Sequence, residues 1–479
     1  MYFFKQHAGI YTDLYELTMA QGYFVNGRKD APACFDYFFR NCPFGGGYVL
    51  MAGLADLLEF LQELKFDDDD LNYLRSLGFK KEFLKYLANF RFRADIHSVR
   101  EGEVIFPNEP VIRVCGNIIE SQLIETLLLN IINFESLIAT KTSRICRSAG
   151  SRIIVDFGLR RAQGLGGIHA SRAAIIGGAK ATSNVYSAFY YDLKTSGTQA
   201  HSWVQSFDDE LTAFRDFAKV YPDNCILLVD TYDTLNEGIP NAIKVGREME
   251  KRGHKLYGVR LDSGDLAYLS KKARKMLDDA GLHYVKIVAS NLLDEYVIRS
   301  LLEQQAPIDA FGVGTKLVTG QPDAALDGIY KLCMSDNKPR MKLSESMEKQ
   351  TLPGIKKVLR YSNGEGMFMA DGILLETEKK ADVIFHPHQP QKHTRVKNFS
   401  AEPLFQKVME KGKITVKIQP PAVIAEYARK RLNMLPQEHQ RFENPHTYKV
   451  GISDRLMNLR KTIMNNILKK FSKTKKARV

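Results

Sequence analysis

The sequence predicts an α/β protein whose middle part, residues 152–318, is a βα barrel or a doubly wound parallel sheet. Short apolar runs alternate there with longer amphipathic stretches, as buried parallel strands alternate with crossover helices. A second observation is that residues typical of active sites follow these runs at the same end each time. The strand-like runs are residues 152–157, 225–229, 255–259, 284–288 and 308–313.

The stretches between the runs have helical periodicity. Residues 241–252 and 266–280 carry charges on one face and Ile, Val, Met or Leu on the other. Gly253 and Gly281 follow them directly, and glycine is the preferred residue just past a helix because it adopts positive φ at little cost. These stretches are therefore predicted to be helices that connect parallel strands.

The length of the chain sets the number of domains. With 479 residues, of which 44% are hydrophobic, it can form roughly two or three domains of about 150 residues each. Alternating residues near 33–39 and 92–114 predict strands ahead of the barrel. We expect an N-terminal α+β domain at 1–120 and a barrel with the active site at 121–335. Residues 336–479 are then an insertion and a C-terminal segment that pack on the N-terminal domain and end in a basic helix.

The cysteines and the apolar segments indicate a protein of the reducing cytoplasm. The six cysteines are scattered without a CxxC pair, which argues against a zinc site and against a disulfide framework. The first residues lack a basic region followed by an apolar core. The most apolar stretch, 118–138, is interrupted by polar residues, so neither a membrane span nor a membrane partner is predicted. These interruptions are Glu120, Glu125, Asn130, Asn133 and Glu135.

Most of the net charge of +13 comes from the C-terminus. Eight basic residues and no acidic one occur from Arg460 to Val479, which leaves +5 for the rest of the chain. This remainder suits an anionic small-molecule substrate. No aromatic interleaving or DNA-binding module accompanies the basic end, so no nucleic-acid partner is predicted. Helical spacing of apolar residues predicts a docked helix that ends in a solvated basic tip; these residues are Leu456, Leu459, Ile463, Ile467 and Phe471.

Clusters of polar residues follow successive strands of the predicted barrel. Because the carboxyl ends of parallel strands meet at one rim, we expect these clusters to converge on an active site. In chain order they are Arg160 and Arg161; Thr198 and His201; Asp230, Thr231 and Asp233; Arg260, Asp262, Ser263 and Gly264; Ser290 and Asn291; and Gly312, Gly314 and Thr315.

Two of these clusters indicate an acidic, phosphate-bearing sugar ligand. The stretch from Gly312 to Thr315 offers glycine amides and a hydroxyl to a phosphate monoester, although a plain tight turn would have the same sequence. Strand alternation sends Arg260 and Asp262 to one side, where they would bind an acid group and a diol, unless they form a structural ion pair. The Arg160–Arg161 doublet suits phosphate or carboxylate, and adjacent arginines can point to different faces, which leaves open whether both enter the site.

The hexapeptide from Gly197 to Ser202 combines a hydroxyl, an imidazole and a flexible backbone. His201 is a candidate base or nucleophile there. The alternative is a histidine on the surface or in the packing.

Five motifs occur in the chain, namely TDLYELTMAQGY at 12–23, DFGLRRAQG at 156–164, GTQAHS at 197–202, RLDSGD at 260–265 and GVGT at 312–315. Together they resemble the nicotinate phosphoribosyltransferase family. Their order and spacing match that family from Thr12 to about Val318, and the C-terminal third is assigned by continuity. The resemblance implies the irregular, incomplete α/β barrel of the type II phosphoribosyltransferases, with an additional α+β domain formed from N-terminal and C-terminal segments.

The resemblance also implies a reaction. Nicotinate and 5-phosphoribosyl 1-diphosphate would give nicotinate mononucleotide and diphosphate, the first step of NAD salvage from nicotinate. ATP hydrolysis would be coupled to the transfer through a phosphohistidine, as in an ATP-dependent ligase, with Mg²⁺ as cofactor. The family further implies a cytoplasmic homodimer with a shared active site.

The family's functional residues map onto this chain as follows. Tyr15 would stack on or border the pyridine ring, Thr198 and Arg260 would hold nicotinate, and Thr315 would bind the 5-phosphate. His201 would be phosphorylated. Asp230 or Asp233 would orient His201 or help to hold Mg²⁺, whose ligands are otherwise left open.

Two alternatives remain at this stage. A nicotinamide phosphoribosyltransferase would share the barrel and the histidine, but the string at 12–23 argues against it. The other alternative is an inactive phosphoribosyl-binding scaffold whose basic tail engages RNA. The intact set of polar residues argues against the scaffold, namely Arg160, Thr198, His201, Arg260, Asp262 and Thr315.

Overall fold

The computed structural model describes residues 6–344 and 350–476 and consists of two compact units. Unit 1 comprises Met1–Leu137, Ala325–Gln419 and Tyr427–Val479, and unit 2 comprises Ile138–Ala324 and Pro420–Glu426. The units meet at residues 137/138 and 324/325, whereas the sequence predicted boundaries after residues 120 and 335. Each unit is described by itself.

Unit 2 is built on a six-stranded sheet in the order β7-β6-β11-β10-β9-β8. Every neighbouring pair is parallel. Among the described residues β7 and β8 do not pair, so the sheet is an incomplete barrel, as predicted. The strands are β6 (Ile153–Asp156), β7 (Ala181–Thr182), β8 (Ile226–Leu228), β9 (Gly258–Leu261), β10 (Lys286–Ser290) and β11 (Ala310–Val313).

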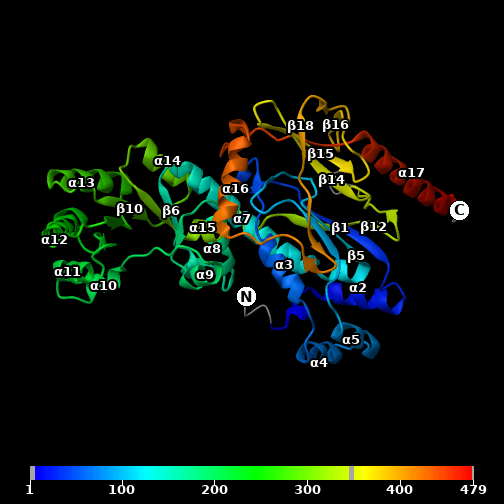
Figure 1. Cartoon of the computed structure of the whole chain (residues 1–479), viewed down its shortest axis with the longest axis horizontal. Helices are drawn as coiled ribbons and strands as arrows, with labels where there is room; N and C mark the ends of the chain where they lie inside the picture. The colour runs from blue at the N-terminus through cyan, green and yellow to red at the C-terminus, as the bar shows by residue number, and fades with distance from the viewer. Residues whose placement is uncertain (1–5, 345–349, 477–479) are drawn as a thin grey trace. The chain divides into compact units, whose positions relative to one another are not determined.

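Helices connect these strands, as Figure 1 shows for the green part of the chain. They are α8 (Gly166–Ile176), α9 (Val185–Tyr191), α10 (His201–Gln205), α11 (Glu210–Val220), α12 (Ile239–Lys251), α13 (Leu266–Asp279), α14 (Glu295–Glu303) and α15 (Thr315–Val318), with short helical turns η3 (Leu159–Arg161) and η4 (Thr234–Gly238).

The predicted helices at 241–252 and 266–280 are confirmed as α12 and α13. Gly253 and Gly281 have φ of 81° and 77°, which lets the chain reverse at each helix end. The strand predicted at 255–259 is shifted, because β9 begins only at Gly258 and therefore contains Arg260.

The longest helical stretch is formed by α6 (Ile118–Leu123) and α7 (Glu125–Ala149), and the boundary between the units falls within α7. By length and composition Ile118–Ala149 could cross a membrane, yet 67% of its most apolar window is buried inside the protein, as in the core helix of a globular domain.

Buried charges of α7 hold α14 in unit 2. Lys141 Nζ lies 2.5 Å and Arg144 Nε 2.9 Å from the carboxylate of Glu295, and all three side chains are buried. Burial lowers the pKa of Lys141, while the Glu295 carboxylate opposes that shift. Because an isolated buried charge is very costly, these pairs fix the position of α14 on α7.

Unit 1 contains two larger sheets. The first is antiparallel, with the order β13-β12-β1-β5-β3-β19-β20, and the second has the order β17-β16-β21-β15-β14-β18. In the first sheet β1 pairs with β12 and β3 pairs with β19, so N-terminal and C-terminal segments form one α+β domain, as predicted (Figure 1).

The strands of the first sheet are β1 (Pro32–Phe39), β3 (Asp95–Ser98), β5 (Ile112–Asn117), β12 (Gly328–Ser335), β13 (Lys338–Pro339), β19 (Gln406–Glu410) and β20 (Lys413–Ile414). Those of the second are β14 (Lys356–Ser362), β15 (Phe368–Leu375), β16 (Val383–Phe385), β17 (His393–Arg395), β18 (Ser400–Pro403) and β21 (Val450–Ile452). A further pair joins β2 (Val49–Leu50) and β4 (Val104–Ile105).

The other long helices are α2 (Leu14–Val25), α3 (Leu54–Glu63), α4 (Asp68–Ser76), α5 (Lys81–Ala88), α16 (Pro421–Met434) and α17 (Asp454–Lys476). A buried arginine links three strands of unit 1. Arg360 on β14 donates to both carboxylate oxygens of Asp371 on β15, at 3.0 and 2.6 Å. It also donates to Val104 O on β4 at 2.7 Å.

The structure corrects the prediction for the cysteines. Cys34 on β1 and Cys115 on β5 form a disulfide and stand directly opposite each other in the register of the two strands. Their sequence separation of 81 gave no spacing signal, because strand register decides which cysteines meet.

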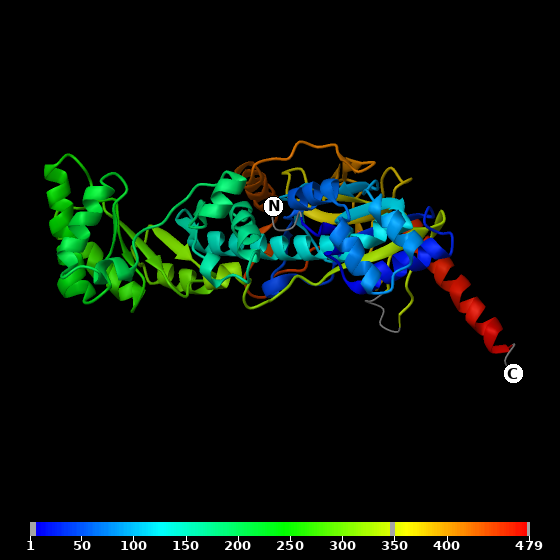
Figure 2. The same cartoon turned by 90° about the horizontal axis from the view of Figure 1, so that it is seen from below.

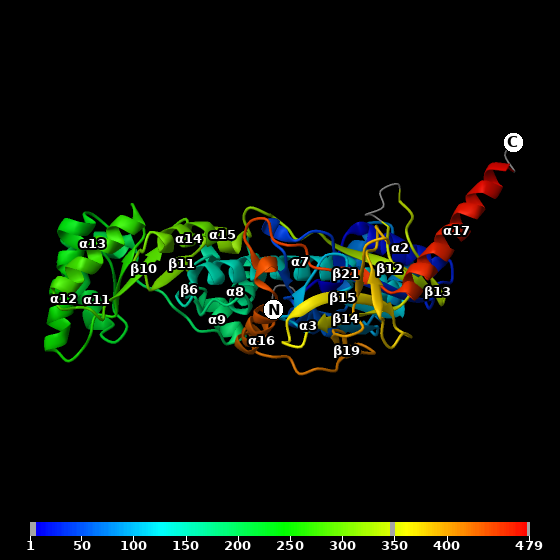
Figure 3. The same ribbon diagram turned by 90° about the horizontal axis from the view of Figure 1, so that it is seen from above.

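The C-terminal helix α17 is docked only at its beginning. Leu456 and Met457 are buried in a cluster with Ile373 and Ile452. Leu459 still lies next to Gly354 and Arg460 lines a pocket of this unit, and the later turns of the helix extend away from its sheets, as Figures 2 and 3 show in red. The prediction of a docked helix was therefore wrong for Ile463 and Ile467, while the side chain of Phe471 and the tip residue Arg478 lie outside the described part of the chain.

Glu16 on α2 provides a test of the packing in unit 1. Its side chain is fully buried, and burial raises the pKa of its carboxyl from 4.5 to about 7, although a hydrogen bond of 2.7 Å from Gln122 opposes the shift. The folded state therefore binds the proton more tightly than the unfolded chain, and the free energy of unfolding falls as the pH rises from about 4.5 through 7.

We expect Glu16→Gln to remove this fall, so that the free energy of unfolding of the variant exceeds that of the wild type by about 3 kcal/mol at pH 8 and is close to it near pH 4.5. Denaturant unfolding at several pH values measures the difference, with Glu82→Gln at an exposed position of α5 as the control. If the free energies of unfolding of the wild type and the variant depend on pH in the same way, the fold does not raise the pKa of Glu16.

Candidate active site

Polar side chains of unit 2 meet at the carboxyl edge of its parallel sheet, where the sequence predicted them. Asp230 follows β8, Arg260 and Asp262 lie at the end of β9, and Ser290 ends β10. Hydrogen bonds connect these residues to one another and to the segment that contains Thr198. The edge therefore has one continuous polar network, which we call the rim.

Arg260 is the buried cation of the rim. Its Nη1 donates to Thr198 Oγ1 at 2.5 Å and to Gln199 O at 3.3 Å. Burial lowers the pKa of Arg260, whereas the carboxylates of Asp262 and Asp230 raise it. Its Nε is buried and has no hydrogen-bond partner. A guanidinium keeps its charge in proteins, so the rim holds a desolvated positive charge with an unused donor.

Asp230 braces the loop that follows β9. Its Oδ2 accepts hydrogen bonds from the Asp262 amide at 2.8 Å and from Ser263 Oγ at 2.6 Å. The next residue, Gly264, has φ of 74°, a conformation that favours glycine. The carboxylate thus fixes the turn that presents Asp262, Ser263 and Gly264 at the rim. Its other oxygen, Oδ1, is buried without a partner.

His201 is the first residue of α10 and is oriented by a threonine. Its Nδ1 lies 3.1 Å from Thr231 Oγ1, within hydrogen-bond distance. Its Nε2 lies 3.8 Å from Asp262 Oδ2, which is too long for a hydrogen bond. The imidazole is 38% exposed, so Nε2 combines access with a fixed ring.

The expectation that Asp230 or Asp233 orients His201 is corrected by these contacts. Asp230 bonds the loop after β9, and Asp233 caps η4 by accepting from the amides of Leu235 and Asn236 at 3.1 and 2.9 Å. Hydrogen bonds, first that of the Asn236 side chain, lower the pKa of Asp233. The hydroxyl of Thr231, one residue after Asp230, orients the ring instead.

Asp262 links His201 to the neighbouring strand. Ser290 Oγ donates a hydrogen bond to Asp262 Oδ1, and Arg260 Nη2 lies 3.8 Å from the same oxygen. Asp262 and Arg260 therefore lie on the same side, as strand alternation predicts. The carboxylate of Asp262 is 28% exposed, so it is open to a ligand.

Gly312 has a packing role that the sequence did not indicate. A Cβ on this residue of β11 would lie only 2.3 Å from the ring of Phe157. The same ring faces the guanidinium carbon of Arg260 at 5.9 Å. Glycine at 312 is thus required by packing against Phe157, and its predicted role in phosphate binding stays a prediction. Gly314 and Thr315 lie where β11 passes into α15, both half-buried, and their predicted role in phosphate binding stays a prediction.

The arginine doublet lies on a loop fixed by a buried carboxylate. Arg160 and Arg161 belong to η3 and are both exposed. Asp156 accepts from the Gly158 amide at 2.8 Å and from Thr182 Oγ1 at 2.7 Å, and burial raises its pKa against these bonds. Burial is the main cause of the lowered pKa of Arg260, and the positive charge of Arg160 lowers it further.

One predicted residue lies in the other unit, and two residues of unit 2 were missed. Tyr15 belongs to unit 1, where it is exposed on α2, and its predicted contact with the pyridine ring stays a prediction. Phe157 and Gln199 were missed, although Phe157 lies within the motif at 156–164 and Gln199 directly follows Thr198. Gln199 is only 6% exposed, and neither its Nε2 nor its Oε1 has a hydrogen-bond partner, so its buried amide has unused capacity.

The rim offers few ligands to a metal ion. Within the described residues, no group of three His, Cys, Asp or Glu ligand atoms close enough to share a metal lies at the rim. Mg²⁺ in phosphoryl and diphosphate sites is usually held by one or two carboxylates and by the substrate itself. The exposed carboxylate of Asp262 fits that requirement.

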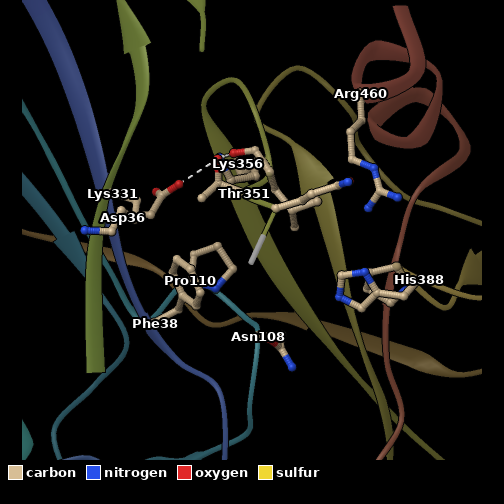
Figure 4. Close-up of a pocket in the computed structure, with 12 residues that line it drawn as sticks. Asp36, Phe38, Asn108, Pro110, Lys331, Thr351, Lys356, His388 and Arg460 are labelled. Atoms are coloured by element: carbon tan, nitrogen blue, oxygen red, sulfur yellow. Dashed lines mark hydrogen bonds and ion pairs between the residues drawn. The ribbon is translucent and has the colours of Figure 1, made fainter. Parts of the chain in front are cut away.

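Unit 1 has a pocket of its own, shown in Figure 4. Within it Lys356 Nζ pairs with Asp36 at 2.7 Å and donates to Leu352 O and Gly354 O at 2.8 and 2.6 Å. All three protons of this ammonium are used, so Lys356 is a structural cation. The pocket is lined by Asp36, Phe38, Asn108, Pro110, Lys331, Gln350, Thr351, Leu352, Lys356, Pro387, His388 and Arg460.

Comparison with known protein families identifies the chain. The models of the nicotinate phosphoribosyltransferase N-terminal domain, family and C-terminal domain match residues 10–133, 153–334 and 355–460. The chain belongs to the nicotinate phosphoribosyltransferase family. The motif at 12–23 lies in the first match and the four rim motifs lie in the second.

Relatives within this family cover nearly the whole chain. The nicotinate phosphoribosyltransferase of Bacillus subtilis (strain 168) is 43% identical over 465 residues, which are 95% of this chain and 94% of that protein. The Homo sapiens enzyme of the same name is 32% identical over 94% of this chain and 95% of its own. The crystal structure of human nicotinic acid phosphoribosyltransferase superposes with a TM-score of 0.85 at 30% identity, covering 95% of this chain and 99% of that one.

The bracing role of Asp230 predicts a loss of stability. Asp230→Ala leaves the Asp262 amide and the Ser263 hydroxyl without their acceptor, so we expect the free energy of unfolding to fall by about 2 to 3 kcal/mol. Denaturant unfolding measures the change. Asp233→Ala, which removes only an exposed cap, should cost about 1 kcal/mol. Equal losses in the two variants would mean that Asp230 does not brace the loop.

Proposed function

We propose that this chain transfers the 5-phosphoribosyl group of 5-phosphoribosyl 1-diphosphate to nicotinate, giving nicotinate mononucleotide and diphosphate. Support comes from the family and from the names of relatives that match over nearly the full length. The single observation that carries the substrate assignment is the buried Arg260 at the rim, next to the buried amide of Gln199.

The carboxylate of nicotinate suits this environment. A buried guanidinium with an unused Nε donor binds an anion more strongly than a neutral group, because charge-assisted hydrogen bonds are stronger when water is excluded. Thr198 holds the guanidinium in place, and its own hydroxyl donates to Gln199 O at 3.1 Å. A carboxamide carries no negative charge, so it would form only a neutral hydrogen bond to this guanidinium, which is weaker.

The transfer step requires no general base. The pyridine nitrogen attacks C1 of the ribose with its lone pair, the bond from C1 to the diphosphate oxygen breaks, and its electrons leave with diphosphate. The attacking nitrogen carries no proton, so catalysis consists of orientation and of charge neutralisation. The exposed guanidinium groups of Arg160 and Arg161 would neutralise phosphate oxygens, and Thr315 would bind the 5-phosphate.

Mg²⁺ belongs to the proposal as the ion that neutralises the departing diphosphate. Asp262 would hold it, since its carboxylate is accessible and oxygen ligands suit this ion. Two hydrogen bonds keep the Asp262 carboxylate in position. Ser290 Oγ donates to the carboxylate itself, and the backbone amide of Asp262 donates to Asp230.

ATP hydrolysis would be coupled to the transfer through His201, which makes the enzyme an ATP-dependent ligase. With Nδ1–H donating to Thr231, Nε2 carries the lone pair, attacks the γ-phosphorus of ATP and displaces ADP. Water later removes the phosphoryl group as phosphate. Phosphorylated His201 would place roughly two negative charges beside Asp262, and this charge would change the affinity for the phosphoribosyl donor.

A homodimer with a shared site, to which Tyr15 of unit 1 contributes, and a cytoplasmic location complete the proposal. Neither nucleic acid nor membrane takes part in the reaction itself.

Product formation by purified protein tests the proposal. We expect nicotinate mononucleotide from nicotinate, 5-phosphoribosyl 1-diphosphate and Mg²⁺, with ATP increasing the rate. We expect His201→Ala to retain a slow transfer that ATP no longer accelerates, because His201 couples ATP and does not touch the bond that breaks. Chromatographic product assays with and without ATP measure both rates.

The chain offers a matched control histidine. His254 is 39% exposed and pairs with Asp223 at 3.1 Å, so His254→Ala removes a similarly exposed imidazole elsewhere on unit 2 and should leave both rates unchanged. Loss of the ATP-independent reaction in His201→Ala would assign His201 to the glycosyl transfer. Absence of any product from the wild type would reject the proposed function.

A further inference from the structure

The second half of α17 packs on neither larger sheet of unit 1 within the described residues. Its first turns are anchored by Leu456 and Met457, Arg460 lines the pocket of unit 1, and the later turns extend alone in all three views (Figures 1, 2 and 3). Neither larger sheet of unit 1 nor its core clusters include a residue beyond Met457 among the described side chains.

This later part of the helix has two different faces. Ile463, Met464, Ile467 and Leu468 follow one another at intervals of one, three and one residues, so they lie on one side of an α-helix. The first three are half-exposed and Leu468 is 52% exposed. The other side carries the exposed Asn465, Asn466 and Lys469.

The charge of this segment has a single sign. From Arg460 to Val479 there are eight basic and no acidic residues, and they supply most of the chain's net charge of +13. The match to the family's C-terminal domain ends at residue 460. The apolar stripe and the basic charge therefore belong to an extension beyond the family's common part, which we call the basic segment.

We propose that the basic segment binds the surface of an anionic lipid bilayer. Amphipathic helices of this kind lie in the interface with the apolar face among the acyl chains and the lysines next to phosphate headgroups. Asn465, Asn466 and Lys469 interrupt the apolar residues, so the helix rests on the membrane and does not span it.

A lipid surface satisfies both faces of the helix, whereas other polyanions satisfy only one. Nucleic acid would bind the basic residues and leave the apolar stripe in water. A second copy of the chain could cover the stripe but would bring two positively charged segments together. The inference is independent of the proposed reaction, because Arg460 to Val479 lie outside the rim.

Vesicle sedimentation with the full chain tests the inference. We expect binding to vesicles of phosphatidylglycerol and phosphatidylcholine and none to phosphatidylcholine alone. Lys461→Gln combined with Lys469→Gln should weaken binding about 30-fold, since each cation contributes about a factor of five. Ile467→Gln combined with Leu468→Gln should weaken it at least about tenfold, because the apolar contact is lost.

Asn465→Gln combined with Asn466→Gln is the matched control, since it changes the same helix without altering its charge or its apolar stripe. All variants should keep the melting temperature and the transferase activity of the wild type, because the changed residues lie outside the core clusters. These two readouts separate loss of lipid binding from misfolding and from any failure of the proposed function.

Three results would overturn the inference. Wild-type protein that does not sediment with anionic vesicles contradicts it directly. Binding that depends on the lysines and is unaffected at Ile467 and Leu468 would indicate a general polyanion site, such as one for nucleic acid. A change of oligomeric state in the Ile467 and Leu468 variant, without lipid binding by the wild type, would assign the stripe to a second copy.

Discussion

The rim of unit 2 depends on one buried positive charge. A guanidinium at the position of Arg260 is costly to bury, and the surrounding residues compensate for this cost. Thr198 and the Gln199 carbonyl accept its hydrogen bonds, and the carboxylates of Asp262 and Asp230 provide counter-charge. Because these acceptors come from three different connections of the sheet, satisfying Arg260 also fixes how the loops meet. His201, which is two residues past Gln199 and faces Asp262, is positioned by the same network.

The sequence predicted the parts of the fold that follow from local periodicity. The apolar runs, the amphipathic stretches and Gly253 and Gly281 identified the strands and helices of unit 2, since each of these signals acts within one element. The location of the rim was also predictable, because parallel strands necessarily end at the same edge. The pairing of N-terminal with C-terminal strands was predicted only from the family resemblance, since the alternation of residues within a strand does not indicate which other strand it pairs with.

The contacts within the site were less predictable, because they depend on how distant elements meet. Thr231 rather than Asp230 orients His201, and the choice is decided by the direction of two adjacent side chains after β8. Gly312 resembles a phosphate-binding glycine in sequence, yet its constraint is the ring of Phe157, which approaches from another strand. The disulfide between Cys34 and Cys115 likewise depends on strand register.

The central claim is that Arg260 selects nicotinate by its carboxylate, and a competition assay tests it most directly. Wild-type protein and Arg260→Gln are given equal concentrations of nicotinate and nicotinamide with 5-phosphoribosyl 1-diphosphate, and both products are measured. The account predicts that the wild type prefers nicotinate. Arg260→Gln should lower kcat/KM for nicotinate by roughly 10-fold to 150-fold, as for the loss of a hydrogen bond to a charged group, with a small change for nicotinamide. A wild type that prefers nicotinamide, or a variant that keeps the full preference for nicotinate, would contradict it.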